Sequence, residues 1–287
     1  MLIRIPVAAY RSEGNVVRVT YLAHSLTRPA VYLDHWALML FGESTELGDR
    51  LVNALRNKGG CLCLSYLHAG ELCQADDPRH ADEVDRLVER LMPHVFLVRA
   101  DHNLKRRGTN PLALVPDIQL AERLARMQLR PPGSPGYFRT FWNSRDLYRD
   151  QDGNTLRDVF EQSTEAMVES FTRTREDIEF RERARTYKPT SNIAAGWVFL
   201  GELMKSDFLT PEEQLDTHDV VDIQHAINLL HCDFALLDRT WASKANQARD
   251  RLKKIGIEVA ECFSRRNNGI GRFLHAVEDY DAGRAKP

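Results

Sequence analysis

Short apolar runs alternate with amphipathic stretches in the first part of the chain. Runs at 30–33, 61–64 and 95–98 are four residues long and predict buried strands. Between them, helical spacing of apolar residues predicts one helix that ends at Gly59 and another over about 80–91. Strands that alternate with helices at this spacing are typical of a parallel α/β sheet.

The same alternation returns near the end of the chain. A helix over about 219–230 precedes a buried strand over 234–237. A helix over 242–254 and a strand over 257–260 follow, and the last predicted element is an amphipathic helix that contains Phe273. We therefore expect two parts of the chain, far apart in sequence, to contribute to one sheet.

The residues between these two parts show no clear strand pattern from 105 to 205. A loop rich in Pro and Gly over 130–136 is followed by a long amphipathic helix over 156–178. Its polar face is dense in Arg and Glu over 173–185, which is typical of a solvated face and is also compatible with contact to RNA or a partner chain. We predict that this stretch is a helical insertion.

The N-terminal residues predict a β-hairpin, with two β-branched runs on either side of a turn at 12–15. The predicted organisation thus has four parts. In chain order these are an N-terminal hairpin or extension over 1–27, the first part of the core over 28–105, a helical insertion over 106–205, and the second part of the core with a C-terminal helix over 206–287.

Composition narrows the function classes. The 287 residues are 43% hydrophobic and 28% charged with a formal net charge of −2, so binding to nucleic acid by bulk positive charge is excluded. Five cysteines without a CxxC pair indicate a reduced, cytoplasmic protein with structural thiols. No stretch predicts a signal peptide or a membrane span, because the longest apolar stretch, 193–201, is too short.

Acidic residues follow two of the predicted strands directly. Asp34 and Asp238 each come at the carboxyl end of an apolar run, where open α/β sheets bind ligands. Glu71 lies on the helix after the second strand, and Asp219 and Asp222 open the helix before 234–237. A cluster of carboxylates without basic partners repels itself, and oxygen ligands suit Mg²⁺ or Mn²⁺. The alternative for each strand-end Asp is a helix N-cap.

Other chemistries lack their motifs. The sequence has no His/Cys set with zinc spacing, no GxSxG, no GxGxxG and no P-loop. Phosphatases that begin with a DxD motif need an acid at position 36, which is Trp36.

Three segments, VYLDHWALM, LSYLHAGEL and DVVDIQHAINLLHCDFALLDRTW, resemble the PIN-domain family, which includes VapC-type toxin endoribonucleases. The resemblance covers roughly residues 28–104 and 210–265. It implies a PIN-like parallel sheet and metal-dependent hydrolysis of RNA phosphodiester bonds that leaves a 5′-phosphate and a 3′-hydroxyl. It also implies an RNA substrate, and it leaves open a homodimer and an antitoxin or regulatory protein as partners.

The resemblance assigns roles to individual residues. The catalytic acids it implies are Asp34, Glu71, Asp222 and Asp238, and the metal ligands are these four together with Asp219. Either Asp219 or Asp222 is the third acid of the family pattern. Residues around these acids and along the substrate path are expected to assist: His225, Ser65 and Thr240 beside the ligands, and Arg239, Lys105, Arg106 and Arg107 on RNA, with Arg265 and Arg266 as further candidates.

The sequence departs from the family at His35 and Trp36, where small PIN proteins often carry a hydroxyl residue and Asn. This departure supports a second hypothesis, a non-catalytic PIN-like scaffold that binds RNA or a protein partner. A third hypothesis is a DNA-directed, structure-specific nuclease with the same metal site. A role as toxin, defence nuclease or RNA-processing enzyme stays open.

Overall fold

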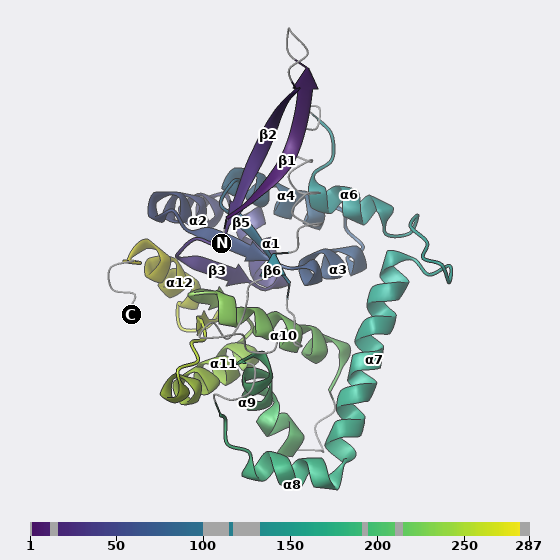
Figure 1. Cartoon of the computed structure of the whole chain (residues 1–287), viewed down its shortest axis with the longest axis vertical. Helices are drawn as coiled ribbons and strands as arrows, with labels where there is room; N and C mark the ends of the chain where they lie inside the picture. The colour runs from purple at the N-terminus through teal and green to yellow at the C-terminus, as the bar shows by residue number, and fades with distance from the viewer. Residues whose placement is uncertain are drawn as a thin grey trace.

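The computed structural model describes residues 2–11, 17–99, 115–116, 133–190, 195–209 and 215–281. The central sheet has six strands in the spatial order β6-β5-β4-β3-β7-β8 (Figure 1). Their bounds are β3 Ala30–Leu33, β4 Cys61–Leu64, β5 Val95–Arg99, β6 Val115–Pro116, β7 Phe234–Leu236 and β8 Glu261–Phe263. All neighbours pair in parallel except β6, which pairs antiparallel with β5 at the edge. The predicted α/β class is confirmed, and this sheet is consistent with a PIN-like fold.

Helices connect the strands and cover both faces of the sheet (Figure 1). Those of the first part are α1 His35–Glu43, α2 Thr45–Lys58, α3 Tyr66–Gln74 and α4 Arg79–Leu91. Those of the rest are α6 Tyr137–Ser144, α7 Leu156–Glu176, α8 Ile178–Thr186, α9 Ala195–Leu209, α10 Thr217–Ile227, α11 Arg239–Leu252 and α12 Gly269–Glu278, with short 3₁₀ turns at Asn228–His231 and Lys253–Ile255. Helix α2 ends as predicted, because Gly59 adopts the left-handed conformation (φ 67°) that terminates a helix readily.

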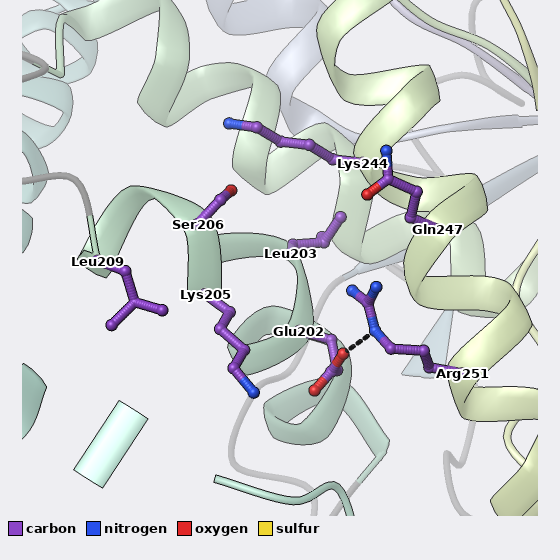
Figure 2. Close-up of a pocket in the computed structure, with 8 residues that line it drawn as sticks. All are labelled: Glu202, Leu203, Lys205, Ser206, Leu209, Lys244, Gln247 and Arg251. Atoms are coloured by element: carbon purple, nitrogen blue, oxygen red, sulfur yellow. Dashed lines mark hydrogen bonds and ion pairs between the residues drawn. The ribbon is translucent and has the colours of Figure 1, made fainter. Parts of the chain in front are cut away.

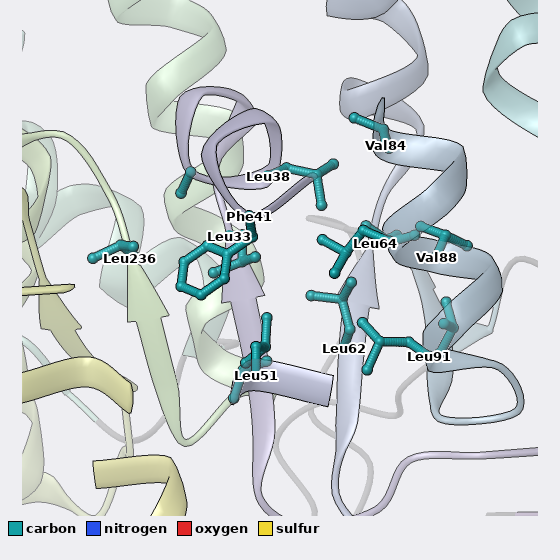
Figure 3. Packing of buried hydrophobic residues seen from close by; sticks show 14 of the residues in the cluster. Leu33, Leu38, Phe41, Leu51, Leu62, Leu64, Val84, Val88, Leu91 and Leu236 are labelled. Carbon is teal, nitrogen blue, oxygen red and sulfur yellow. The ribbon is translucent and has the colours of Figure 1, made fainter. Parts of the chain in front are cut away.

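Alternate residues of each strand enter two separate hydrophobic cores. Leu33, Leu62 and Leu64 pack with α1, α2 and α4 on one face, as Figure 3 shows. Tyr32 and Cys63 enter the second core, which contains apolar residues of α9, α10 and α11. Both faces of the sheet are thus buried, which explains why the strands are continuous apolar runs in the sequence. All five cysteines are buried and free, so the cysteines behave as structural hydrophobes.

Two predicted boundaries are wrong. The last strand lies at Glu261–Phe263 rather than 257–260, because its parallel register begins where Phe234 of β7 faces Glu261. Ile257 and Ala260 are buried in the second core without joining the sheet. The helix predicted over 156–178 divides at Asp177, whose carboxylate accepts a hydrogen bond from the Phe180 amide (3.0 Å) and so caps α8.

The segment predicted as a helical insertion is mainly helical within the described ranges, with two corrections. Val115 and Pro116 form β6, so the expectation that no strand lies between 105 and 205 is wrong at the sheet edge. The predicted boundary at 205 falls inside α9, whose Phe199 and Leu203 are buried in the second core. Helix α9 is therefore part of the sheet domain. Helix α7 runs alongside that domain and contacts α3 and α10 (Figure 1).

At the N-terminus, β1 (Leu2–Arg11) and β2 (Val17–Ser25) pair antiparallel as a separate two-stranded sheet. The turn predicted at 12–15 lies outside the described residues, as do Lys105, Arg106 and Arg107. In the ranges that the structure covers, no helix combines the length and apolarity needed to cross a membrane.

Candidate active site at the carboxyl edge of the sheet

Asp34 and Asp238 follow two neighbouring strands, β3 and β7, at the same edge of the sheet. Asp34 follows β3, and its Oδ1 accepts a hydrogen bond from the Ala37 amide (3.1 Å) at the start of α1. Asp238 follows β7 and caps α11 in the same way, through the Trp241 amide (2.7 Å). Both residues therefore have the capping role that the sequence offered as an alternative. Each cap occupies one oxygen of its carboxylate, so capping does not prevent a second role.

Asp34 is only 4% exposed and lies among other acids. Burial raises the pKa of its carboxyl well above the ordinary value, and the charges of Asp222, Glu71 and Asp238 raise it further. Four of the predicted acids, from β3, α3, α10 and the end of β7, are thus close enough to repel one another. No lysine or arginine in the described ranges forms an ion pair with any of them.

The structure distinguishes the two candidates for the third acid. Asp219 accepts a hydrogen bond from the Asp216 amide (3.2 Å), and Asp216 in turn accepts one from the Asp219 amide (2.9 Å). This reciprocal pair is a capping box at the start of α10. Asp222, one turn later, faces the acids. Burial, the charges of Asp238 and Glu71 and a hydrogen bond to Asp238 raise its pKa to about 8. Of the two candidates, Asp222 is therefore the one that lies among the other acids.

Glu71 has histidine neighbours. Its Oε2 lies 2.7 Å from His225 Nε2 and 4.0 Å from His35 Nδ1. Burial alone would raise the pKa of Glu71, but His225, His35 and His68 lower it by more. Burial lowers the pKa of His68 to about 4, so at neutral pH His68 is uncharged and Glu71 is stabilised by the direct hydrogen bond from His225.

A buried hydrogen-bond network sets the orientation of His225. Because the ionised Glu71 carboxylate can only accept, His225 Nε2 donates to it and Nδ1 accepts from the Tyr32 hydroxyl (2.5 Å). The Tyr32 oxygen lies 3.0 Å from Ser65 Oγ and accepts from the Asn228 side-chain amide (3.2 Å). The predicted supporting residues His225 and Ser65 thus belong to one network that ends on Glu71.

The same network continues to the strand end that carries Asp34. His68 Nε2 donates to the carbonyl of Leu33 (2.8 Å), and its Nδ1 accepts from the Ser65 amide (3.0 Å). His68 is fully buried. The two strand ends that precede Asp34 and Ser65 are therefore held together by one neutral imidazole.

The remaining predicted residues lie around this edge without contacts to the acids. Arg239 and Thr240 are exposed in the first turn of α11, directly after Asp238. Arg265 stacks its guanidinium over the Trp36 ring, 4.3 Å from the ring centre. Arg266 is exposed.

A cleft of about 490 Å³ opens beside Glu71 and Asp222. Helix α7 lines it together with α3 and α10. Its lining residues are His35, Glu71, Gln74, Ala75, His80, Phe160, Glu161, Thr164, Glu165, Thr217, His218, Val221 and Asp222. A Cβ on Gly70 would lie 2.1 Å from the Phe160 ring, so this glycine permits the close approach of α7 to α3.

The donor set fits a hard divalent cation in its chemistry. The converging groups are carboxylates without a basic counter-ion, which favour Mg²⁺ or Mn²⁺. The Nδ1 atom of His35, 4.0 Å from Glu71, is buried without a hydrogen-bond partner, which leaves a further donor atom at the site. Within the described part of the chain, however, no group of three or more His, Cys, Asp or Glu side chains is arranged so that it could hold a metal ion.

Comparison with protein-family models, with curated proteins and with solved structures finds no match to this chain. The assignment of chemistry to this site therefore depends on its residues alone.

Sequence reasoning missed two features of the site. Tyr32 reads as a core residue of a buried strand, and only its pairing beside β4 and β7 brings its hydroxyl to His225. The contribution of α7 to the cleft was also missed. Gly70, a glycine inside a predicted helix, is a signal of close packing, but no spacing rule connects it to Phe160.

We predict that Tyr32→Phe lowers the free energy of unfolding by about 1–3 kcal/mol, because it removes the donor for His225 Nδ1 inside the core. Tyr66→Phe is the matched control, since the Tyr66 hydroxyl donates to Gln224 (2.9 Å) from a residue that is 48% exposed. Urea denaturation measures both. Equal losses in the two variants would mean that the buried hydrogen bond of Tyr32 contributes no more to stability than the exposed hydrogen bond of Tyr66.

We also predict that Asp222→Asn stabilises the metal-free protein in a pH-dependent way. The pKa of the Asp222 carboxyl rises from its ordinary value of 3.8 to about 8 in the folded protein. Protonated Asp222 therefore stabilises the fold, and this contribution is complete at pH values below 3.8. That stabilisation is lost as the pH rises through about 8. Asparagine has no charge to bury, so the advantage of the variant should grow to about 1–2 kcal/mol, a few degrees in Tm, by pH 8.

Thermal unfolding in EDTA at pH 4.5 and pH 8 measures this difference. Asp219→Ala is the control, because loss of its capping role should destabilise the protein at both pH values. An advantage of Asp222→Asn that does not change with pH would contradict the predicted charge repulsion.

Proposed function

We propose that this protein is a PIN-type, Mg²⁺- or Mn²⁺-dependent endoribonuclease that hydrolyses RNA phosphodiester bonds. One observation carries the proposal: Asp34, Glu71, Asp222 and Asp238 gather at the carboxyl edge of a parallel sheet without a Lys or Arg partner in the described ranges. This arrangement opposes ionisation of Asp34 and Asp222, and a bound cation would relieve the repulsion.

In this proposal Asp34, Glu71 and Asp238 hold the cation, and Asp222 completes the site and orients the attacking water. A bound Mg²⁺ or Mn²⁺ supplies a nucleophilic water at neutral pH and neutralises the departing oxygen. Helix caps keep Asp34 and Asp238 in place through backbone amides. His225 fixes one oxygen of Glu71, because the Tyr32 hydroxyl holds its ring in a single tautomer.

The cleft suggests how RNA approaches Glu71 and Asp222, the two acids of this set that line it. Its volume is about 490 Å³, and α7 encloses it on one side. Such a site suits an extended single strand better than a duplex, whose second strand would meet α7. Arg239, exposed beside Asp238, is placed to contact the phosphate backbone, and Lys105, Arg106 and Arg107 keep the same proposed role.

The cellular role is proposed at the level of class. A toxin with an antitoxin, a defence nuclease and an RNA-processing enzyme are all compatible with this site. The five buried, unpaired thiols support a reducing compartment such as the cytoplasm. A homodimer or a regulatory protein partner remains part of the proposal.

A second candidate is a non-catalytic PIN-like scaffold. Two observations favour it. Among the described residues, no group of three or more His, Cys, Asp or Glu side chains could hold a metal ion, and Asp34 and Asp238 already cap helices. The two candidates differ in one property, since a scaffold has no affinity for Mn²⁺ that depends on Asp34. A DNA-directed nuclease would share the metal site and differ only in substrate.

We predict that the purified protein cleaves single-stranded or loop RNA in the presence of Mg²⁺ or Mn²⁺. Asp34→Asn should reduce the cleavage rate about a thousandfold, because it removes a charge that holds the cation while preserving the helix cap. Gel electrophoresis of a labelled RNA panel measures the rate. Asp250→Asn, an exposed carboxylate on α11, is the control and should cleave like the wild type.

Circular dichroism and gel filtration check that both variants are folded. Cleavage by folded Asp34→Asn at near the wild-type rate would place the activity elsewhere. A wild-type protein that cleaves neither RNA nor DNA while failing to bind Mn²⁺ would favour the scaffold.

A further inference from the structure

A second site lies between α8 and α9, and it shares no lining residue with the acidic cleft. This site, which we call the aromatic groove, has a volume of about 320 Å³. That volume is within the range of about 300–1,000 Å³ that is common for small-molecule sites. Its lining includes three aromatic rings, two cations and a glycine: Phe180, Tyr187, Trp197, Arg183, Lys205 and Gly201.

The two cations of the aromatic groove lack acidic partners in the described part of the chain. The Arg183 guanidinium donates to the Glu179 carbonyl (3.3 Å) and lies 5.9 Å from the centre of the Phe180 ring. Lys205 Nζ donates to the Tyr187 carbonyl (3.1 Å). Two other arginines of α7 and α8 differ, since Arg173 pairs with Glu169 and Arg185 with Glu182. The groove therefore has positive charge that no described carboxylate neutralises.

The neighbouring cleft between α9 and α11 shows the contrast. It holds about 330 Å³ and is also lined by Lys205, with Lys244 and Arg251 on α11 (Figure 2). Lys244 pairs with Asp207 (2.7 Å), and Arg251 pairs with Glu202, as the dashed line in Figure 2 shows. In the same view the amino group of Lys205 points away from Lys244. The unbalanced charge of Lys205 thus belongs to the aromatic groove.

We propose that the aromatic groove binds a base of single-stranded RNA together with its adjoining phosphate. Flat rings stack on any base, and Arg and Lys neutralise the phosphate beside it. This inference rests on the proposed function, because RNA is the substrate there. It adds a second anchor that holds the strand away from the acids, so the charged helices of the insertion contribute to substrate binding rather than to catalysis.

The charges favour RNA over an apolar protein segment. A peptide without acidic residues would bury Arg183 and Lys205 beneath it without a partner, and the desolvation of two unpaired cations opposes that complex. A nucleotide combines an aromatic body with an anion, which matches the rings and the two cations at once.

Gly201 supplies a direct test. A Cβ at this position would lie 3.6 Å from the Tyr187 ring, an ordinary contact, so Gly201→Ala fits without displacement. Gly201→Leu extends further and fills the groove while retaining every aromatic ring and both cations. Tryptophan fluorescence measures the titration of each protein with a short oligoadenylate in EDTA, which prevents hydrolysis. Trp197→Phe identifies the part of the signal that arises in the groove.

We expect oligoadenylate to change the fluorescence of the wild type and of Gly201→Ala. Gly201→Leu and the double variant Arg183→Gln/Lys205→Gln should each bind at least about tenfold more weakly, consistent with the loss of one stacked base or its phosphate contacts. Circular dichroism confirms that the variants are folded. Competition by free AMP at the same site would show that the base and phosphate suffice and would support the proposal.

Unchanged affinity in Gly201→Leu would overturn the proposal, as would binding that depends on Asp34 instead of the groove. Binding of a protein partner that is lost in these variants, with no response to oligoadenylate, would assign the groove to that partner and also overturn the proposal. The outcome is separate from catalysis. Groove-dependent binding without cleavage would support the groove proposal and refute the nuclease function. Cleavage without groove-dependent binding would refute the groove proposal and support the nuclease function.

Discussion

Parallel pairing of β3 with β4 on one side and β7 on the other determines the arrangement of the whole site. Val31 lies opposite Leu62 and opposite Phe234, so residues far apart in the sequence end their strands at the same edge. The Asp34 amide donates to the Leu236 carbonyl (3.1 Å), which extends this register to the acids. Because the strands are short and both faces are buried, a shift in register would move every strand-end residue away from its neighbours at this edge.

The acids at this edge oppose folding, and the surrounding structure compensates for them. Buried carboxylates that face one another cost free energy whenever they ionise. The N-terminal amides of α1 and α11 stabilise Asp34 and Asp238 through hydrogen bonds and the helix dipole. His225 stabilises Glu71, and Tyr32 keeps His225 in the required tautomer. No comparable donor among the described residues reaches Asp222, and its raised pKa of about 8 marks it, like Asp34, as a group that gains from a bound cation.

The strands and the strand-end acids could be predicted from the sequence, because four-residue apolar runs followed by Asp are local signals. The choice between Asp219 and Asp222 could not be made from the sequence, since the two acids lie one helical turn apart on the same helix. Only the capping box that Asp219 forms with Asp216 distinguishes them. The last strand was misplaced because the apolar run at 257–260 is buried beside the sheet rather than in it. Contacts of Tyr32 with His225 and of Phe160 with Gly70 depend on tertiary packing, which the order of residues does not reveal.

Calorimetric titration of Mn²⁺ into the intact protein near pH 7, repeated in buffers with different ionisation enthalpies, tests the acid cluster most directly. Because the pKa of Asp222 is about 8, the metal-free site holds a proton that a cation must replace. We expect Mn²⁺ to bind at one cluster and to release at least one proton per protein, with both effects lost in Asp34→Asn. Binding without proton release, or proton release that persists in Asp34→Asn, would contradict the assignment of these carboxylates to a metal site.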